Sequence, residues 1–393
     1  EQKIRAARKS LATSGFAQDD VARALEEGAI SESEAALVRR ARVLRRKATS
    51  LLDFTEGWLP NKYRTLFYHS DIPSLVADYD LIHLHNALPA LEMRRIAEAC
   101  RRLGKPYVLT THGFVEILGM QTAYQLNPMQ ALAGRLFVTR PLQFVIAHAE
   151  KICCLAPQDQ ALLAQRGVPP EKLVVIPNGV QKSYFQQPTA EALKAICDRL
   201  SLPQTKSVDV PVCFFLANHT RNKGLDILLE AFLGSDVPYL LVVGGKKRDY
   251  DYAAYQSRTR AGQRVVFTDR LTDGEIRALH HYADLFVFPS RADTLPLVVL
   301  EAMAAGRPVL STRVGGIPYQ IDETCGRLVE PENPVALRQA FEDLVKDRAR
   351  LSRLGQAALD RVATRFDWDR SAEMTFEVYK QILAQSLPRA ANR

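Results

Sequence analysis

The chain has 393 residues, of which 47% are hydrophobic and 24% are charged, a globular composition with length enough for two or three domains. It has no run near the 18 apolar residues of a membrane-spanning helix, and its six cysteines lack the spacing of a secreted disulfide framework. The net charge of +8 favours binding to an anionic small molecule, a nucleic acid or an anionic membrane surface, and the charge alone does not distinguish among these partners.

The first fifty residues are predicted to form a helical hairpin. Gly28 ends its first helix, and Ser31 with Glu34 forms a capping box that begins the second. The basic run at residues 39–47 lies on that second helix, either as a solvated face or as a surface for anionic lipid. A packing role for residues 1–50 is the plainer interpretation.

Short apolar runs alternate with helical stretches over the next part of the chain. Strands are predicted at residues 80–85, 105–111, 151–155 and 173–176, with helices at 91–103 and from about 158. Helical connections of ten or more residues imply parallel strands. Near Gln187 the alternation starts again, and further strands are predicted at residues 210–216, 239–243, 265–267, 285–288 and 309–310.

The two series of strands predict an α/β fold with two doubly wound parallel-sheet domains. We place the first domain at residues 1–185, the second at 186–367 and a C-terminal helix at 368–393. Ligands of such folds bind outside the carboxyl ends of the strands. The cleft between two facing domains is therefore the expected site.

Two carboxylates lie eight positions apart near the end of the second series. Asp293 follows the strand at 285–288, and Glu301 lies one turn inside the next helix. The N-terminus of a helix offers unpaired N–H groups and the positive end of the dipole, which attract phosphate. Glu301 can accept hydrogen bonds from ribose hydroxyls, and Asp293 can hold the hydroxyls of a sugar. This segment predicts a site for a nucleotide diphosphate sugar.

Two cations begin the helix that follows the strand at 210–216. Arg221 and Lys223 oppose the dipole of that helix, which weakens the helix unless an anion lies beside them. A diphosphate needs such charges, because negative charge builds on it when its bond to the sugar breaks. The alternative interpretation is a solvated basic turn.

His112 follows the strand at 105–111, where it could hydrogen-bond a donor sugar or orient an acceptor. His83 and His85 share another strand, and we expect them on opposite faces, with one of them packed in the sheet. The sequence has neither a cluster with metal-ligand spacing nor a P-loop motif. Nucleic-acid binding is disfavoured because the basic residues lack interleaved aromatic residues.

Taken together, the motifs between residues 78 and 385 resemble the family-4 retaining glycosyltransferases, which have the GT-B fold. The matching motifs lie at residues 80–85, 111–113, 176–180, 223–226, 283–290, 293–301, 314–318 and 326–329. The tail around Trp368 resembles the family's last helix, which crosses back to the first domain. The resemblance implies two Rossmann-like domains that face each other across a cleft, here preceded by a helical N-terminal segment.

The resemblance also implies which residues form the site. It gives catalytic roles to His112, Lys223 and Asp293, and it implies no metal ion. It gives donor-binding roles to Asn218, Arg221, Arg270, Leu271, Thr294, Leu295, Leu297, Val298 and Glu301. The amides of Leu297 and Val298 would meet the distal phosphate, and the loop that carries Arg270 and Leu271 would recognise the base.

The sequence departs from the family pattern in three places. Asp293 stands where the family usually has a glutamate. Asn218 stands where an arginine often pairs with the lysine, and Arg221 could replace that arginine. The usual opening strand with its Gly-rich loop is missing from residues 1–79, where only residues 65–68 are typical of a strand.

The function implied is transfer of a sugar from a UDP or GDP sugar to an acceptor hydroxyl with retention of configuration, without a metal cofactor. The acceptor would be a saccharide, a lipid-linked saccharide or a small molecule, in the synthesis of a polysaccharide, glycolipid or glycoconjugate. The chain starts at Glu1 and shows no signal peptide, although a segment before it could have been removed. We expect a cytoplasmic protein, with a peripheral contact at the inner membrane face as a further expectation.

Two alternatives remain. The first is a degenerate GT-B protein that binds a nucleotide sugar or a partner without transfer. The second is a nucleotide-sugar epimerase of the same fold. Turnover of the nucleotide sugar without an acceptor would identify the epimerase, and failure to bind any nucleotide sugar would favour the degenerate protein.

Overall fold

In the computed structural model the described residues are 68–390, apart from residue 87, residue 111 and the segments 113–127 and 247–251. The predicted hairpin at residues 1–50 lies outside this range. The described chain divides into two compact units. One contains residues 68–82, Leu88–Tyr107 and Ala133–His148, and the other contains the remainder. The domain boundaries after residues 185 and 367 stay a prediction.

The first unit is helical. Its elements are α5 (Ile72–Leu75), the 3-10 helix η2 (Val76–Asp78), α6 (Ala90–Arg102), the π-helical η3 (Arg135–Thr139) and α10 (Arg140–His148). Helix α9 (Pro128–Gly134) leads into η3, and its residues up to Leu132 belong to the other unit. Helix α6 packs against α10, where the Arg94 guanidinium lies 5.1 Å from the centre of the Phe144 ring. The helix predicted at residues 91–103 is α6 and is confirmed.

A four-stranded parallel sheet has the order β1-β2-β3-β4. Its strands are β1 (Ile82–His85), β2 (Tyr107–Thr110), β3 (Lys151–Cys154) and β4 (Leu173–Val175). Thr110 pairs with Cys153, and Cys154 pairs with Val175. Helix α11 (Pro157–Gln165) and the 3-10 helix η4 (Pro170–Lys172) connect β3 to β4. The four strands predicted in this region are confirmed, with ends that differ by one or two residues.

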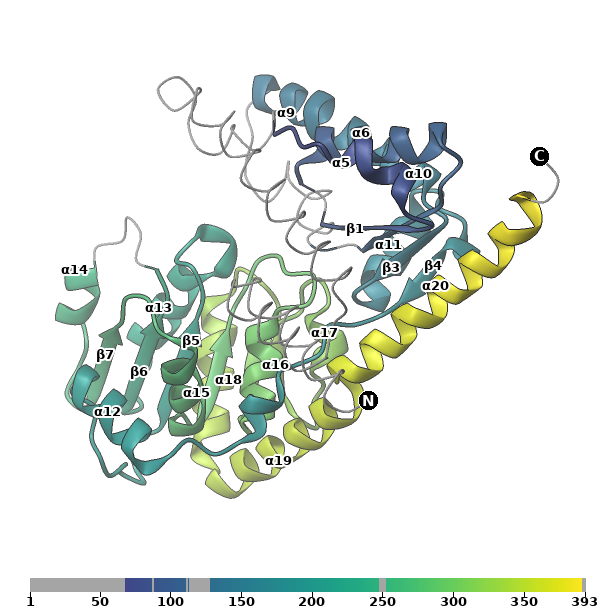
Figure 1. Ribbon diagram of the computed structural model, residues 1–393. Helices are drawn as coiled ribbons and strands as arrows, with labels where there is room; N and C mark the ends of the chain where they lie inside the picture. Colours follow the sequence, from purple (N-terminus) through teal and green to yellow (C-terminus); the bar gives the residue numbers. More distant parts are fainter. Residues whose placement is uncertain (1–67, 87, 111, 113–127, 247–251, 391–393) are drawn as a thin grey trace. The chain divides into compact units, whose positions relative to one another are not determined.

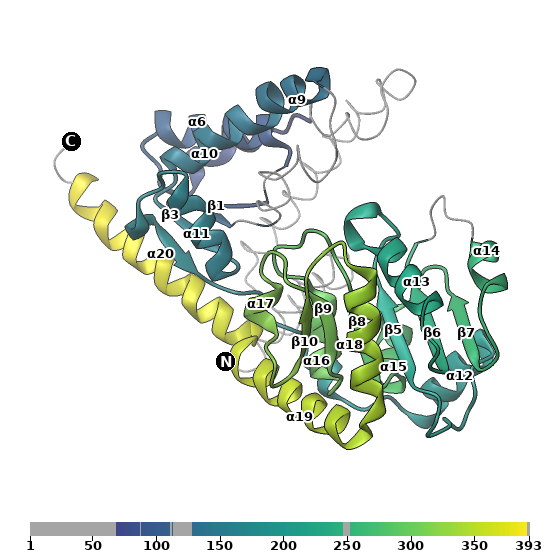
Figure 2. The same cartoon turned by 180° about the vertical axis from the view of Figure 1, so that it is seen from behind.

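A six-stranded sheet has the order β10-β9-β8-β5-β6-β7, and all its paired strands are parallel (Figures 1 and 2). The strands are β5 (Val212–Leu216), β6 (Tyr239–Gly244), β7 (Gln263–Phe267), β8 (Leu285–Phe288), β9 (Val309–Thr312) and β10 (Gly326–Val329). The helices are α12 (Ala190–Leu200), α13 (Leu225–Leu233), α14 (Tyr252–Ser257), α15 (Asp273–Tyr282), α16 (Leu297–Ala304), α17 (Ile317–Gln320), α18 (Pro334–Lys346) and α19 (Arg348–Arg365). The 3-10 helix η5 (Lys182–Phe185) precedes α12, and η6 (Arg221–Lys223) precedes α13. The predicted doubly wound sheet is confirmed.

The chain reverses its direction of winding between β5 and β8. The chain moves outward from β5 through α13 to β6, and later in the opposite direction from β8 through α16 to β9. Crossovers between parallel strands are right-handed as a rule, so opposite directions place the connecting helices on opposite faces. Helices α13 and α18 therefore pack together on one face, and α15 and α16 pack together on the other. The carboxyl ends of β5 and β8 form the switch point of the sheet, where such folds bind ligands.

The central strands of this sheet are buried on both faces. Phe214 and Phe286 sit on neighbouring strands with ring centroids 5.9 Å apart, and Phe288 is 1% exposed. Runs of apolar residues without alternation are what a doubly covered parallel strand requires. Among the described helices, none combines the length and the apolar character needed to cross a membrane.

The long helix α20 (Trp368–Ala390) packs along the four-stranded sheet (Figure 2). Near its start, the Ser371 hydroxyl donates to the Pro177 carbonyl at 2.6 Å, just beyond β4. Further along, the Tyr379 hydroxyl shares a hydrogen bond with Nδ1 of His83 on β1. The helix thus crosses the sheet from its last strand to its first.

Candidate functional site

Two loops meet at the switch point of the six-stranded sheet. The amide of Arg291, after β8, donates to the carbonyl of Asn222, after β5, at 2.7 Å. The Ser290 hydroxyl oxygen lies 2.9 Å from the same carbonyl oxygen. Because the two strands are neighbours in the sheet, these contacts hold two segments together that lie about seventy positions apart in the sequence.

Lys223 and Asp293 form an ion pair between these two loops. The ammonium Nζ lies 2.9 Å from Oδ1 and 3.0 Å from Oδ2 of the carboxylate. The Ser290 hydroxyl donates to Oδ2 at 2.7 Å. The Lys223 side chain is 22% exposed and that of Asp293 is 10% exposed, so the pair lies just below the surface. Charge-assisted hydrogen bonds of this length hold both side chains in place.

Glycines allow the backbones around this pair to approach closely. Gly224 has φ of +71°, and a Cβ atom there would lie 1.9 Å from the carbonyl oxygen of Pro289. Gly315 has φ of +48°, and a Cβ atom there would lie 1.7 Å from the carbonyl oxygen of Asp293. A side chain at either position would push the loops apart. The glycines therefore position Lys223 and Asp293 by permitting contact from both sides.

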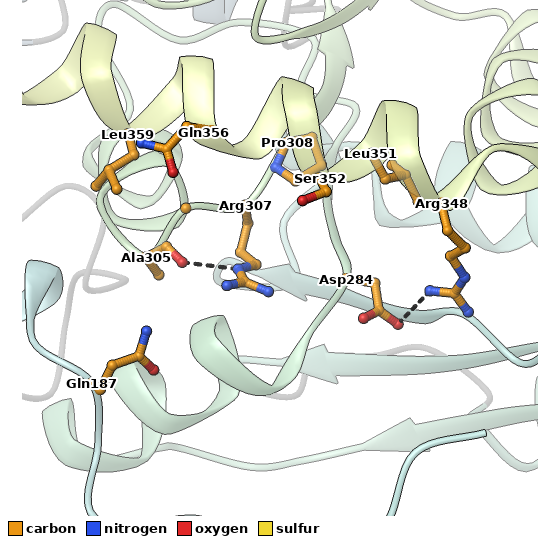
Figure 3. Close-up of a pocket in the computed structure, with 11 residues that line it drawn as sticks. Gln187, Asp284, Ala305, Arg307, Pro308, Arg348, Leu351, Ser352, Gln356 and Leu359 are labelled. Atoms are coloured by element: carbon orange, nitrogen blue, oxygen red, sulfur yellow. Dashed lines mark hydrogen bonds and ion pairs between the residues drawn. The ribbon is translucent and has the colours of Figure 1, made fainter. Parts of the chain in front are cut away.

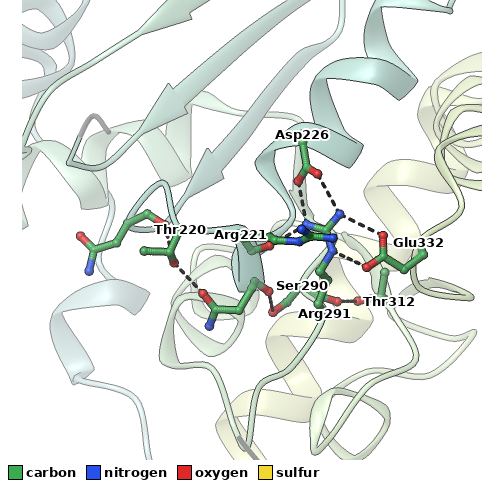
Figure 4. A network of polar contacts seen from close by, with 9 residues as sticks. Thr220, Arg221, Asp226, Ser290, Arg291, Thr312 and Glu332 are labelled. Atoms are coloured by element: carbon green, nitrogen blue, oxygen red, sulfur yellow. Dashed lines mark hydrogen bonds and ion pairs between the residues drawn. The ribbon is translucent and has the colours of Figure 1, made fainter. Parts of the chain in front are cut away.

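An arginine network braces the same loops (Figure 4). The Arg291 guanidinium donates to both carboxylate oxygens of Asp226 at 2.7 and 2.8 Å, and it also pairs with Glu332. Burial alone would raise the pKa of Asp226, but its hydrogen bonds and attraction to Arg291 hold that pKa below its usual value. Arg291 thus ties the β8 loop to the start of α13 and to the loop after β10.

The sequence predicted Arg221 as a partner of Lys223 at the diphosphate. The structure places its backbone in the arginine network, where its carbonyl accepts a hydrogen bond from Arg291 at 2.6 Å. Its exposed side chain lies close enough to Glu332 to help Arg291 lower the pKa of that carboxyl. Neither Arg291 nor Glu332 was predicted as a site residue, because neither belongs to a motif.

Helix α16 begins directly after the Asp293 loop. Pro296 is its N-cap, so Leu297 and Val298 occupy its first turn, and Leu297 is 42% exposed. Amides of a first turn have no partner within their own helix. The Thr294 hydroxyl is buried and has no hydrogen-bond partner among the described residues, and Leu295 beside it is buried. Unsatisfied donors therefore gather at this helix start, which suits an anionic, hydroxyl-bearing ligand.

Glu301 lies on α16, one turn in from Leu297. Its carboxylate Oε2 lies 3.9 Å from Nε2 of His280 on α15, and the side chain is 18% exposed. Burial raises the pKa of Tyr184 on η5, and the nearby charge of this carboxylate raises it further. Glu301 therefore keeps one side toward solvent and one toward buried donors.

The remaining predicted donor residues follow neighbouring strands of the same sheet. Asn218 is exposed after β5, and Arg270 is exposed after β7. Leu271 lies against the end of β6, where its Cδ1 would be 2.9 Å from a Cβ atom at Gly244. All three belong to the carboxyl edge of the sheet, as Lys223 does.

A cavity of about 470 Å³ lies beside the four-stranded sheet and α20. His112 lines it together with His83, His85 and Tyr379. The rings of His83 and His85 are 3.9 Å apart, and those of His85 and His112 are 5.8 Å apart. The expectation that His83 and His85 point to opposite faces is wrong, because side chains two positions apart in a strand share a face.

Burial keeps these imidazoles neutral at physiological pH. It lowers the pKa of His83 to about 3, with further contributions from His85 and His112. It also lowers the pKa of His85 and that of His112. A neutral imidazole can both donate and accept a hydrogen bond, so the cavity can bind hydroxyl groups.

A second cavity, of about 340 Å³, lies at the amino ends of β8 and β9 (Figure 3). Arg307 lines it and donates to the carbonyls of Ala305 and Ala283 at 2.9 Å each. These carbonyls end α16 and α15, so the cation caps two helix C-termini. This edge of the sheet is the one opposite Lys223 and Asp293.

Two family models match consecutive parts of the chain. Glycosyltransferase Family 4 matches residues 29–184, and Glycosyl transferases group 1 matches residues 199–361. D-inositol 3-phosphate glycosyltransferase 1 of Catenulispora acidiphila is 29% identical over 323 residues, which is 78% of this chain and 73% of that protein. The putative teichuronic acid biosynthesis glycosyltransferase TuaC of Bacillus subtilis is 26% identical over 310 residues, covering 78% and 72%.

Solved structures share the fold. Sucrose-phosphate synthase from Thermosynechococcus elongatus matches with a TM-score of 0.62 and 23% identity, over 91% of this chain and 81% of that one. Anabaena HepE in complex with UDP-glucose matches with a TM-score of 0.63 and 21% identity, over 79% of this chain and 81% of that one. The family matches and the two parallel sheets together show that the chain belongs to the family-4 glycosyltransferases of the GT-B fold, and that it is an enzyme that transfers sugar from a nucleotide sugar.

Proposed function

We propose that this chain is a retaining glycosyltransferase whose donor, a UDP or GDP sugar, binds at the loops after β5 and β8. The observation that supports this most is the Lys223–Asp293 ion pair, held at the switch point of the sheet and directly before the N-terminus of α16. A cation, a carboxylate and unpaired helix amides meet there, and these groups suit a diphosphate that carries a sugar.

The two charged side chains take different parts in transfer. Lys223 moves its ammonium from Asp293 to the diphosphate and stabilises the negative charge that develops as the sugar–phosphate bond breaks. Asp293 then holds hydroxyls of the donor sugar, and His112 contributes from the acceptor side. The acceptor hydroxyl forms the new bond on the same face of the sugar, and its proton passes to the departing phosphate.

The rest of the donor follows the carboxyl edge of the sheet. The amides of Leu297 and Val298 bind the distal phosphate, and the Thr294 hydroxyl gains the partner that it lacks without a ligand. Glu301 accepts hydrogen bonds from ribose hydroxyls. The base lies near Arg270 and Leu271. Asn218 and Arg221 lie at the same edge and complete the donor site.

The acceptor occupies the cavity that contains His112. Its neutral imidazoles, the amide of Asn178 and the hydroxyls of α20 suit a polyhydroxylated acceptor. The names of two relatives refer to an inositol phosphate and to teichuronic acid synthesis, so a small polyol and a cell-wall saccharide are both candidate acceptors. Metal-independent transfer and a contact between residues 39–47 and a membrane stay predictions.

The test replaces the cation of the donor site. Lys223→Ala should lower turnover of the UDP or GDP sugar that the wild type uses by roughly 100- to 1,000-fold, because the leaving group loses its charge partner. Release of UDP or GDP, with and without saccharide acceptors, measures this. NMR of the product tests whether the configuration is retained.

Lys206→Ala is the matched control. Lys206 pairs with Asp284 at 2.6 Å and is similarly half-buried, but it lies at the amino end of β8. Its loss should leave turnover within about twofold if the charge effect is local. Equal turnover in Lys223→Ala and wild type would refute this site.

A further inference from the structure

Two buried side chains with hydrogen-bond donors flank the carboxylate of Glu301. His280 of α15 is fully buried, and its Nε2 lies 3.9 Å from Oε2 of Glu301. Tyr184 of η5 is 6% exposed, and η5 packs against α16 so closely that burial, together with the charge of Glu301, raises the pKa of the Tyr184 phenol. The two rings lie edge to face, with centroids 6.1 Å apart.

The His280 imidazole packs among aromatic rings. Its ring centroid lies 5.1 Å from that of Phe214 and 5.2 Å from that of Phe286. Neither of its ring nitrogens has a hydrogen-bond partner within the described part of the chain. Burying an N–H group without an acceptor is unfavourable, and Glu301 presents a charged acceptor close by. A small rotation of either side chain would complete that bond.

Burial also fixes the protonation state of this group. It lowers the pKa of His280, even though the charge of Glu301 acts in the opposite direction. The imidazole is therefore neutral and has one N–H to donate. A neutral donor can orient the carboxylate without cancelling its charge.

Tyr184 is held in place by the helix that carries His280. The ring nitrogen Nε2 of His281, next along α15, bonds the carbonyl of Tyr184 at 3.2 Å. Burial raises the pKa of Tyr184, and the charge of Glu301 raises it further, so the phenol stays protonated and has a proton to donate. One helix thus sets the positions of both donors.

We infer that His280 and Tyr184 are positioning residues that fix the orientation of Glu301 and thereby set the preference for ribose over deoxyribose nucleotides. A carboxylate has about four acceptor positions, so two buried donors leave the remaining positions for the vicinal hydroxyls of a ribose. A glutamate that is already oriented loses less conformational freedom when the nucleotide binds. The inference rests on the ribose-binding role of Glu301 in the proposed function.

The test compares two variants with a matched control. Tyr184→Phe removes one hydroxyl, and His280→Phe removes both ring nitrogens in an aromatic surrounding. Tyr282→Phe is the control: Tyr282 is also buried, lies on α15, and donates to the Pro203 carbonyl at 2.8 Å, away from Glu301. Calorimetry gives the Kd of the full chain for UDP, GDP and ADP and for the 2′-deoxy form of each.

We expect the wild type to bind its ribonucleotide at least tenfold more tightly than the deoxy form. Tyr184→Phe and His280→Phe should each weaken ribonucleotide binding by roughly tenfold and leave deoxynucleotide binding nearly unchanged, since Glu301 loses a buried donor that orients its charged carboxylate. Tyr184→Phe and His280→Phe should therefore largely lose the preference for the ribonucleotide over the deoxynucleotide, whereas Tyr282→Phe should keep it. Thermal unfolding verifies that each variant is folded, and Tyr184→Phe alone decides if His280→Phe does not fold.

Glu301→Ala separates this inference from the proposed function. If the wild type shows no preference, or Glu301→Ala retains it, then Glu301 does not bind ribose, and the proposed donor site and this inference both fail. If Glu301→Ala loses the preference but folded Tyr184→Phe and His280→Phe keep it, only the inference is overturned.

Discussion

Single residues hold the loops of the proposed donor site through backbone contact as much as through charge. Asp293 stands where the family usually has a glutamate, yet its carboxylate is still reached by Lys223 and Ser290. Gly315 lets the chain press against the Asp293 carbonyl, which brings the shorter side chain into range. The missing methylene is compatible with the ion pair, because glycine positions the backbone.

Replacing Gly224 tests this close packing. Gly224→Ala should destabilise the protein by more than about 2 kcal/mol, because its Cβ would collide with the Pro289 carbonyl and the backbone would be strained as well. Gly167→Ala is the control, because Gly167 has φ of +83° but no atom within 4 Å of an added Cβ. Gly167→Ala should lower the free energy of unfolding by only about 1 kcal/mol, which is the backbone strain of a side chain at positive φ. Urea unfolding measures the free energy of unfolding of both variants. Equal decreases in Gly224→Ala and Gly167→Ala would contradict a collision at Gly224.

Helix α20 is the element that links the end of the chain to the histidines of the four-stranded sheet. Ser371, Thr375 and Tyr379 fall on one side of it and line the cavity with His83 and His112. Because Tyr379 bonds His83 directly, the packing of this helix depends on the protonation state of a buried imidazole.

The stability of this packing should decrease in acid. The pKa of His83 falls from 6.5 to about 3 through burial, then through its neighbours His85 and His112. Above pH 6.5 the group is neutral in both states, so its contribution is complete. Between pH 6.5 and 3 the unfolded chain takes up a proton that the folded chain does not, so stability falls.

A variant that cannot take up this proton isolates the effect. His83→Gln should flatten the loss of melting temperature between pH 7.5 and 4.5, while His85 and His112 account for part of the slope that remains. His148→Gln, which removes an exposed histidine, should keep the wild-type slope. Identical slopes in His83→Gln and wild type would show that His83 is not a buried neutral imidazole.

At the scale of the whole molecule, binding of the donor should stabilise the folded chain. A nucleotide present at 100 times its Kd adds about 2.7 kcal/mol, which raises the melting temperature by a few degrees. Thermal unfolding with UDP-, GDP- and ADP-sugars would identify the base. Lys206→Ala should show the wild-type shift and Lys223→Ala a smaller one. The shift should persist in EDTA if donor binding needs no metal ion.

The absence of any shift with all three nucleotides would favour the degenerate protein. Turnover of the nucleotide sugar without an acceptor would instead favour the epimerase. The family membership holds in either case, because it rests on the sequence and the fold rather than on binding.

The positions of the strands along the chain were predictable because a strand buried on both faces must be apolar throughout, a local property of the sequence. The runs that became β5, β6 and β8 were found to within about two residues. The spacing of Asp293 and Glu301 was equally local, since a strand, a loop and one helical turn separate them. The sequence thus determined the fold class and the segment of the donor site.

Contacts between distant residues were decided only by the tertiary structure. Arg291 reaches Asp226 and Glu332 from a different loop, and His280 and Tyr184 meet Glu301 from two other elements. No periodicity connects such residues, because their proximity follows from the order of strands in the sheet and the handedness of the crossovers. The charged groups of the proposed donor site were predicted from the sequence, and the folding of distant loops onto one another decided which side chains hold them in place.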